Sequence, residues 1–173
     1  MKKLVFAGSL MAVAASSVFA AAGTLDVNGE IVTAACGVDP QSSNLVVNLG
    51  KVPTHVFKKG GDRSSSQDFN IKLTQCDTST LKTVAVRFAG AAAPGNTQLM
   101  ATTGSASGVG VRLQNATGEL LQLGQYGSPI NLVDGTNTLR FTAAYEALGD
   151  SKAAASVKPG TANGHAEFDL NYQ

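Results

Sequence analysis

The sequence predicts an all-β domain, most simply a β-sandwich. Short runs with alternating apolar and polar residues recur along the chain, and turn-forming segments separate them. No segment shows sustained helical periodicity, and 19 glycines with only 14% charged residues argue against a helical protein. At 173 residues, the chain is long enough for one domain with a proper core and too short for two comfortable ones.

Residues 1–20 have the pattern of a secretory signal peptide. They begin with Met1-Lys2-Lys3, continue in an apolar run over residues 4–15, and carry small or aliphatic residues at the positions that a signal peptidase reads. The apolar run is shorter than the roughly 20 residues that a membrane-spanning helix needs, so a membrane anchor is the weaker interpretation. We expect cleavage after Ala20, although a cut after Ala22 also fits the sequence.

The net charge of the exported chain is close to zero. Removal of the signal peptide takes two lysines and no acidic residue, which leaves 11 basic and 12 acidic residues and a net charge of −1. Such a chain has no strong electrostatic attraction for nucleic acid or for an anionic membrane. We therefore expect no nucleic-acid partner.

Cys36 and Cys76 are the two cysteines of the chain, and both follow the predicted signal peptide. In an oxidising compartment, such a pair most simply forms one disulfide. A metal site lacks ligands, because His55 and His165 are the only histidines and neither lies at a zinc-site spacing from the cysteines. Closing a loop of this size is worth roughly 4 kcal/mol in the chain-entropy model.

The predicted strands follow one another at short intervals. Residues 24–35 indicate two extended pieces that meet at Gly29, where the alternation is interrupted. Residues 152–155 have helix propensity, but glycine and proline flank them and we interpret them as a loop. The other alternating runs cover residues 45–49, 69–73, 84–88, 109–113 and 139–145, and the turn-rich segments include residues 59–62, 93–96 and 134–137.

The end of the chain is predicted to form a half-buried strand with one apolar face. Its apolar or small residues occupy the even positions, and its polar residues occupy the odd positions between them. The chain stops at Gln173, so no later strand of this sequence can cover the free edge. We expect either an earlier segment or another molecule to cover it. The even positions are Ala162, Gly164, Ala166, Phe168, Leu170 and Tyr172.

Four motifs carry a family resemblance. Tyr172 is the penultimate residue, and Gly160 lies fourteen residues from the end, with alternating apolar residues between them. Residues 29–36 lead into the first cysteine, residues 70–77 contain the second, and residues 135–145 form the penultimate run. In this order, and with the signal peptide and the cysteine separation, these motifs resemble those of chaperone-usher pilins of the type 1 fimbrial family.

The resemblance implies an incomplete immunoglobulin-like sandwich that lacks its seventh strand and is completed by a donor strand from a partner. In that family, a hydrophobic groove beside the last strand receives first a strand of a periplasmic chaperone and then the N-terminal extension of the next subunit, a known case of β-strand addition. The implied organisation is a signal peptide at residues 1–20, a donor-strand extension at residues 21–28 and a pilin domain at residues 29–173.

The same resemblance assigns roles to two sets of residues. The expected donor residues alternate along the extension and are Ala21, Gly23, Leu25 and Val27. The expected groove and chaperone-contact residues are Gly160, Ala166, Phe168, Leu170 and Tyr172. From the residues alone, it is an equal alternative that Gly23 is only a flexible residue after the cleavage site and that Leu25 and Val27 begin the first core strand.

By resemblance, the chain is a structural subunit of a surface fimbria that polymerises by donor-strand exchange and supports adhesion. Its expected route is export through the periplasm to the cell-surface fimbrium. The expected partners are a periplasmic pilus chaperone, an outer-membrane usher and neighbouring pilin subunits in a homopolymer, with no cofactor and no enzymatic activity. We expect a major shaft subunit, with a minor or adaptor pilin as the alternative, and the length excludes a two-domain tip adhesin.

Other classes of protein fit less well. A small outer-membrane β-barrel shares the signal peptide and the alternation, but runs of about five residues are shorter than the roughly 9–11 needed to cross a bilayer. A carbohydrate-binding sandwich needs exposed aromatic residues, whereas this chain has no tryptophan and three tyrosines. Catalysis has little support, because the Ser64-Ser65-Ser66 run has no base beside it and both histidines are expected to be solvated.

Overall fold

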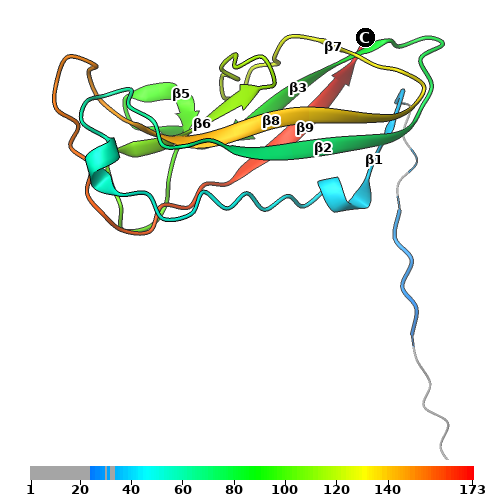
Figure 1. The fold of residues 1–173 in the computed structure, drawn as a ribbon. Helices are drawn as coiled ribbons and strands as arrows, with labels where there is room; N and C mark the ends of the chain where they lie inside the picture. Colours follow the sequence, from blue (N-terminus) through cyan, green and yellow to red (C-terminus); the bar gives the residue numbers. More distant parts are fainter. Residues whose placement is uncertain (1–23, 30, 32–33) are drawn as a thin grey trace, which may run out of the picture. The chain divides into compact units, whose positions relative to one another are not determined.

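The computed structural model describes residues 24–29, 31 and 34–173, and the chain divides into two units, Met1–Val32 and Thr33–Gln173. In the first unit, the described residues form neither helix nor strand. The predicted signal peptide lies outside the described residues, as do Ala21 and Gly23 of the predicted donor strand. All the described strands belong to the second unit, which is considered from here on (Figure 1).

The second unit is built from two antiparallel sheets. The larger sheet has the strand order β1-β2-β8-β6-β5-β4, and the smaller sheet has the order β7-β3-β9 (Figure 1). The strands of the larger sheet are β1 (Gly37–Val38), β2 (Gln67–Cys76), β4 (Ala92–Ala93), β5 (Asn96–Met100), β6 (Val109–Asn115) and β8 (Gly135–Ala147). The strands of the smaller sheet are β3 (Thr83–Gly90), β7 (Ile130–Asn131) and β9 (Ala166–Tyr172).

The 13-residue strand β8 is the centre of the larger sheet, because β2 pairs with one of its edges and β6 with the other. Its odd residues Leu139, Phe141 and Ala143 are buried, whereas Arg140 is exposed and Thr142 is half-buried. This is the alternation expected of a strand with one face on a core. The predicted strand at residues 139–145 is therefore confirmed, and β8 extends it in both directions.

Aromatic side chains from both sheets form the middle of the core. Phe141 of β8 packs against Phe69 of β2 and Phe88 of β3, with ring centroids 5.5 Å and 5.4 Å away. Phe168 of β9 joins this cluster through Phe88, at 6.5 Å. Burial of large apolar side chains contributes about 1.5–3 kcal/mol each, so this cluster is a main source of the attraction between the sheets.

Helical structure is limited, as predicted. The described residues contain two short 3₁₀ turns, η1 (Pro40–Ser42) and η2 (Thr54–Val56), and residues 152–155 form a loop. No helix in the described part of the chain has the length and hydrophobicity of a membrane span.

Two sequence predictions differ from the observed strands. Residues 45–49 are not part of any strand, although their side chains alternate, because a strand also requires a hydrogen-bonded neighbour. The last strand begins at Ala166 rather than Ala162, since Asn163 pairs instead with Thr103 in the connection between β5 and β6. The short strands β4, β5 and β7 were not predicted, because their sequences lack a sustained alternation.

One buried charge cluster lies on the outer face of the larger sheet. Glu146 of β8 accepts hydrogen bonds at one carboxylate oxygen from Arg63, at 2.9 Å, and from Arg112, at 3.0 Å. The side chains of Glu146 and Arg112 are 9% and 13% exposed, whereas that of Arg63 is 47% exposed. Arg63 thereby attaches the loop before β2 to the sheet.

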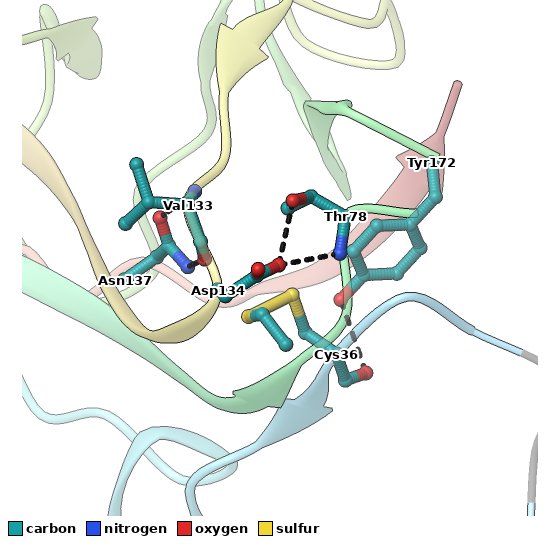
Figure 2. The surroundings of a disulfide bond; sticks show 7 residues. Cys36, Thr78, Val133, Asp134, Asn137 and Tyr172 are labelled. Carbon is teal, nitrogen blue, oxygen red and sulfur yellow. Dashed lines mark hydrogen bonds between the residues drawn. A yellow bond between two sulfur atoms is a disulfide. The ribbon is translucent and has the colours of Figure 1, made fainter. Parts of the chain in front are cut away.

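The predicted disulfide between Cys36 and Cys76 is present. It joins the residue before β1 to the last residue of β2, and the backbone N–H of Asp77 donates to the carbonyl of Ala35 at 2.9 Å. Figure 2 shows the surroundings of the bond, where Asp134 accepts hydrogen bonds from both the backbone N–H and the hydroxyl of Thr78. The start of the domain is therefore fixed covalently to one end of β2.

Replacing both cysteines, as in Cys36→Ser with Cys76→Ser, is expected to destabilise the domain by about 4 kcal/mol, because the unfolded chain regains the entropy of a 40-residue loop. The measurement is the amount of periplasmic protein together with the urea midpoint of what accumulates. Detection of two free thiols in folded, exported wild-type protein would contradict the structural role of this bond.

Candidate functional site

An open groove of about 1430 Å³ lies beside the start of the last strand and is a candidate site. One wall is formed by residues 43–52, and the other is formed by residues 157–168. The floor consists of core side chains from both sheets, namely Phe69, Phe88, Met100, Val111, Leu113 and Ala143. Phe69 is half-buried and the other five floor residues are buried, so the groove reaches down to the surface of the core.

One wall of the groove includes the start of β9, and β9 has an unpaired edge. The backbones of Thr83 and Gln173 donate hydrogen bonds to each other, each at 2.9 Å. In an antiparallel pair of strands, such doubly hydrogen-bonded residue pairs recur at every second position, so they also occur at every second residue back along β9. The exchanging pairs therefore involve Asn171, Asp169 and Glu167. The backbone N–H and C=O groups of Ala166, Phe168, Leu170 and Tyr172 consequently point to the opposite edge, where the described residues provide no strand partner.

The side chains of these same four residues point into the core. Each is partly buried and packs against the main core cluster, whereas Glu167 and Asp169 between them are exposed. These side chains are only partly buried because no strand lies beside β9 on its outer edge to cover them. The predicted set Ala166, Phe168, Leu170 and Tyr172 thus lies on one apolar face beside a free edge.

The opposite wall is an extended segment with an unpaired backbone. Between η1 and η2, the chain runs along the side of the domain without forming a strand (Figure 1). Residues 44–52 make no backbone-to-backbone hydrogen bond with any other described residue. Val47 and Leu49 pack partly buried against the core, while Val46 is 94% exposed, so the segment has strand-like alternation without a strand partner.

Tyr172 closes one end of the region. Its hydroxyl donates to the backbone carbonyl of Cys36 at 3.3 Å, which joins the end of β9 to the beginning of the domain (Figure 2). Burial raises the pKa of Tyr172 above its usual value, because the phenolate is disfavoured where water is excluded. The pKa of Tyr145, whose hydroxyl donates to the carbonyl of Ala162, is raised for the same reason.

Gly160 lies at the other end, where two connections pass very close to each other. A Cβ atom at Gly160 would lie 2.4 Å from the backbone nitrogen of Ala106 and 2.5 Å from the carbonyl carbon of Ser105. The backbone N–H of Ala106 donates to the carbonyl of Thr161 at 3.0 Å, so this approach is fixed by hydrogen bonding. Glycine is required here because a side chain has no room.

The metal-ligating residue types and the predicted solvated histidines can be located in the described part of the chain. They contain no cluster of three potential metal-ligating side chains, and both His55 and His165 are exposed. Ser64 has a structural role, since its hydroxyl accepts a hydrogen bond from the backbone N–H of Tyr145 and donates to the carbonyl of Ser65. The groove itself is lined mainly by apolar side chains and unpaired backbone, which suits an extended peptide.

Sequence reasoning found one wall of this groove and missed the other. Gly160, Ala166 and Phe168 of the predicted set line the groove, whereas Leu170 and Tyr172 lie further along β9 and do not line it. Their predicted role in binding a strand remains a prediction. Residues 43–52 and the floor residues Met100 and Val111 were not identified from the sequence as parts of a site. The alternation of Leu45, Val47 and Leu49 was the available signal. Leu25 and Val27 belong to the first unit, and their predicted donor role remains a prediction.

The all-β fold is that of chaperone-usher pilins. A solved chaperone-usher pilus, described in terms of the molecular basis of rod uncoiling, matches with a TM-score of 0.76 and 27% sequence identity, over 92% of this chain and 100% of that chain. A model of the family described as fimbrial protein matches residues 25–173. The chain therefore belongs to the fimbrial protein family.

Two bacterial relatives support the same assignment. The chain is 39% identical over 151 residues to the Fimbria A protein of Serratia marcescens, which covers 87% of this chain and 84% of the relative. It is 40% identical over 158 residues to the type-1 fimbrial protein A chain of Escherichia coli strain K12, with the same two coverages. The predicted resemblance to type 1 fimbrial subunits is thereby confirmed.

Substitution Gly160→Ala is expected to destabilise the domain by about 1–3 kcal/mol, because the new methyl group overlaps backbone atoms that are already hydrogen-bonded. Gly37→Ala is the matched control, since a Cβ there meets Thr74 only at ordinary contact distances of 3.7 and 3.8 Å. The measurement is the difference in urea midpoint between the two variants. Equal stability of both would refute the close-approach role of Gly160.

Stability is expected to fall as the pH rises above about 10, where the tyrosines of the unfolded chain ionise while Tyr172 and Tyr145 stay protonated in the folded chain. The stabilisation that the two protonated tyrosines provide is complete below that pH. It is lost as the pH rises through their raised pKa values in the folded chain. Tyr172→Phe should cost about 1 kcal/mol at neutral pH and should reduce the alkaline decrease, with Tyr145 causing the rest. Unfolding midpoints between pH 7 and about 11 test this, and identical pH slopes for wild type and variant would contradict it.

Proposed function

We propose that this chain is a structural subunit of a chaperone-usher surface fimbria and that it polymerises by donor-strand exchange. The observation that carries the proposal is the groove between two unpaired backbones, the free edge of β9 and residues 44–52. An added strand would find hydrogen-bonding groups on both sides and an apolar floor beneath it. Main-chain hydrogen bonds would provide the strength and alternate side chains the register.

The proposed donor is the N-terminal extension of a neighbouring copy, residues 21–28 after cleavage behind Ala20. Its residues Ala21, Gly23, Leu25 and Val27 alternate with polar or small residues, which matches the period of a strand lying on an apolar floor. Gly23 would allow a close approach where a Cβ would collide. The membership of the fimbrial protein family supports this assignment over the start of an intramolecular core strand.

Before assembly, the groove would be occupied by a strand of a periplasmic chaperone, and an outer-membrane usher would exchange the two. The physical need for a chaperone follows from the groove itself. Exposed apolar surface costs about 25 cal/mol per Å², and an unpaired strand edge promotes aggregation. A subunit with an empty groove would therefore be poorly stable alone, and adhesion would be the outcome of the assembled fibre on the cell surface.

We propose a position in the fibre shaft and no enzymatic role. The support is the similarity to a solved chaperone-usher pilus described in terms of its rod, over 100% of that chain. The mainly apolar lining of the groove favours a structural role over catalysis. A minor or adaptor subunit of the same system is the alternative.

Deletion of residues 21–26 is expected to leave a subunit that still folds with its chaperone and keeps its disulfide, because the groove is intact, yet cannot extend a fibre. A synthetic peptide of residues 21–29 should bind the chaperone-released subunit and raise its melting temperature. The matched control peptide carries Leu25→Ser and Val27→Ser, which removes two apolar side chains and leaves the backbone unchanged. A second control carries Thr24→Ser and Asp26→Ser on the other face and should bind like the original.

The proposal fails if the peptide neither binds nor stabilises the released subunit. It also fails in its intermolecular form if the deletion destabilises the monomer itself, since that result means that the segment folds into its own groove. Melting curves of the full-length and deleted monomers, with and without peptide, separate these outcomes.

A further inference from the structure

Met100 lies in the groove floor and is the one methionine downstream of the predicted signal peptide. The chain contains three methionines, and Met1 and Met11 fall within residues 1–20. Met100 is the last residue of β5, where its backbone pairs with Val111 of β6 and Ala92 of β4. Its side chain belongs to the main core cluster, is 8% exposed and contributes to the lining of the groove.

The side chain of Met100 packs closely against the connection before β9. On the side of the last connection, a Cβ atom placed on Gly164 would lie 2.7 Å from the Cε methyl of Met100 and 3.4 Å from its Sδ atom. The same Cβ would lie 3.5 Å from Val111, so Gly164, Val111 and Met100 are already in close contact. A further atom bonded to the sulfur therefore has little space toward Gly164.

We propose that Met100 is an oxidation site that controls the occupancy of the groove. The oxidant is a peroxide, which reaches the sulfur through the empty groove and is excluded when a strand fills it. Oxidation then weakens the binding of the strand. This inference rests on the proposed function, because the bound strand is the proposed donor.

The chemistry is a two-electron oxygen transfer. The lone pair of Met100 Sδ attacks one oxygen of hydrogen peroxide, the O–O bond breaks, and proton transfer releases the other oxygen as water. The product is methionine sulfoxide, so the sulfur is oxidised and the peroxide is reduced. Sulfoxide formation turns a flexible apolar side chain into a polar one.

The polar oxygen would lie where the donor side chains pack. The neighbouring floor is made of Phe69, Phe88, Val111 and Leu113, none of which can donate a hydrogen bond. Burying a polar group without a hydrogen-bond partner costs free energy, and this cost corresponds to a loss in affinity of about tenfold or more. Sulfoxide at residue 100 should therefore weaken donor binding by about tenfold.

The first experiment measures protection. The folded, chaperone-released subunit is treated with hydrogen peroxide with and without the peptide of residues 21–29, and the rate of gain of one oxygen atom at Met100 is followed by mass spectrometry. We expect oxidation to be at least several-fold slower with the peptide bound. Equal rates in both samples would overturn the claim that the groove is the route to the sulfur.

The second experiment measures the consequence. Wild-type subunit is oxidised in denaturant with its disulfide intact, so that access plays no role, then refolded with the peptide, and its affinity is compared with that of untreated subunit. Met100→Leu is the matched control, because it keeps a similar volume and cannot form a sulfoxide. We expect a loss of about tenfold in peptide affinity for oxidised wild type and no change for Met100→Leu after the same treatment.

The outcomes distinguish the two proposals. Equal peptide affinity of oxidised and untreated wild type overturns the role of Met100 while leaving strand addition intact. Failure of the peptide to bind untreated wild type contradicts the proposed function itself. If the Met100→Leu variant also loses peptide affinity after the peroxide treatment, oxidation of another residue causes the loss, and the inference is overturned.

Discussion

The structure depends on one constraint: β9 is paired along a single edge. Its side chains Phe168 and Leu170 contribute to the core between the sheets, yet the backbone beside them has no neighbouring strand among the described residues. Two contacts keep β9 in position. The ring of Phe168 packs against that of Phe88 in the core, and the hydroxyl of Tyr172 donates a hydrogen bond to Cys36 at the end of the strand. These contacts hold β9 but leave its outer backbone edge without a hydrogen-bonded partner, and the groove lies beside that edge. The extended segment on the other side of the groove also lacks a backbone partner.

The other long edge of the smaller sheet, that of β3, is covered. Beyond its short pairing with β7, β3 is covered by the loop before that strand, because Gly127 donates to the carbonyl of Val86 at 2.9 Å and Gly124 donates to that of Phe88 at 2.7 Å. Tyr126 of the same loop stacks on the guanidinium of Arg87 at 4.9 Å. A covered edge resists association with other chains. The two edges of this three-stranded sheet therefore differ: that of β3 is covered by a loop, whereas that of β9 has no strand partner among the described residues.

The sequence was most informative where a strand finds its partners within the chain. Residues 69–73, 84–88, 109–113 and 139–145 alternate and are flanked by turns, and all four became strands. Residues 45–49 alternate equally well and form no strand, because pairing is a property of the neighbour and not of the segment. The close approaches of Gly160 to Ser105 and of Gly164 to Met100 involve residues more than fifty positions apart, so local patterns could not reveal them. The disulfide was predictable, because two cysteines after the predicted signal peptide leave a single pairing.

The charge cluster at Glu146 has an evolutionary consequence. Arg112 and Glu146 share a nearly buried ion pair, so replacing Glu146 alone leaves the nearly buried charge of Arg112 without this partner, at a cost of several kcal/mol. Replacing Arg112 alone leaves Glu146 paired with Arg63. Arg63 is half exposed and can be replaced with less loss. Among relatives, exposed loop residues are free to diverge, whereas the residues at positions 112 and 146 should covary as one inherited unit. The surface loops and the pair that joins β6 to β8 are therefore expected to change at different rates.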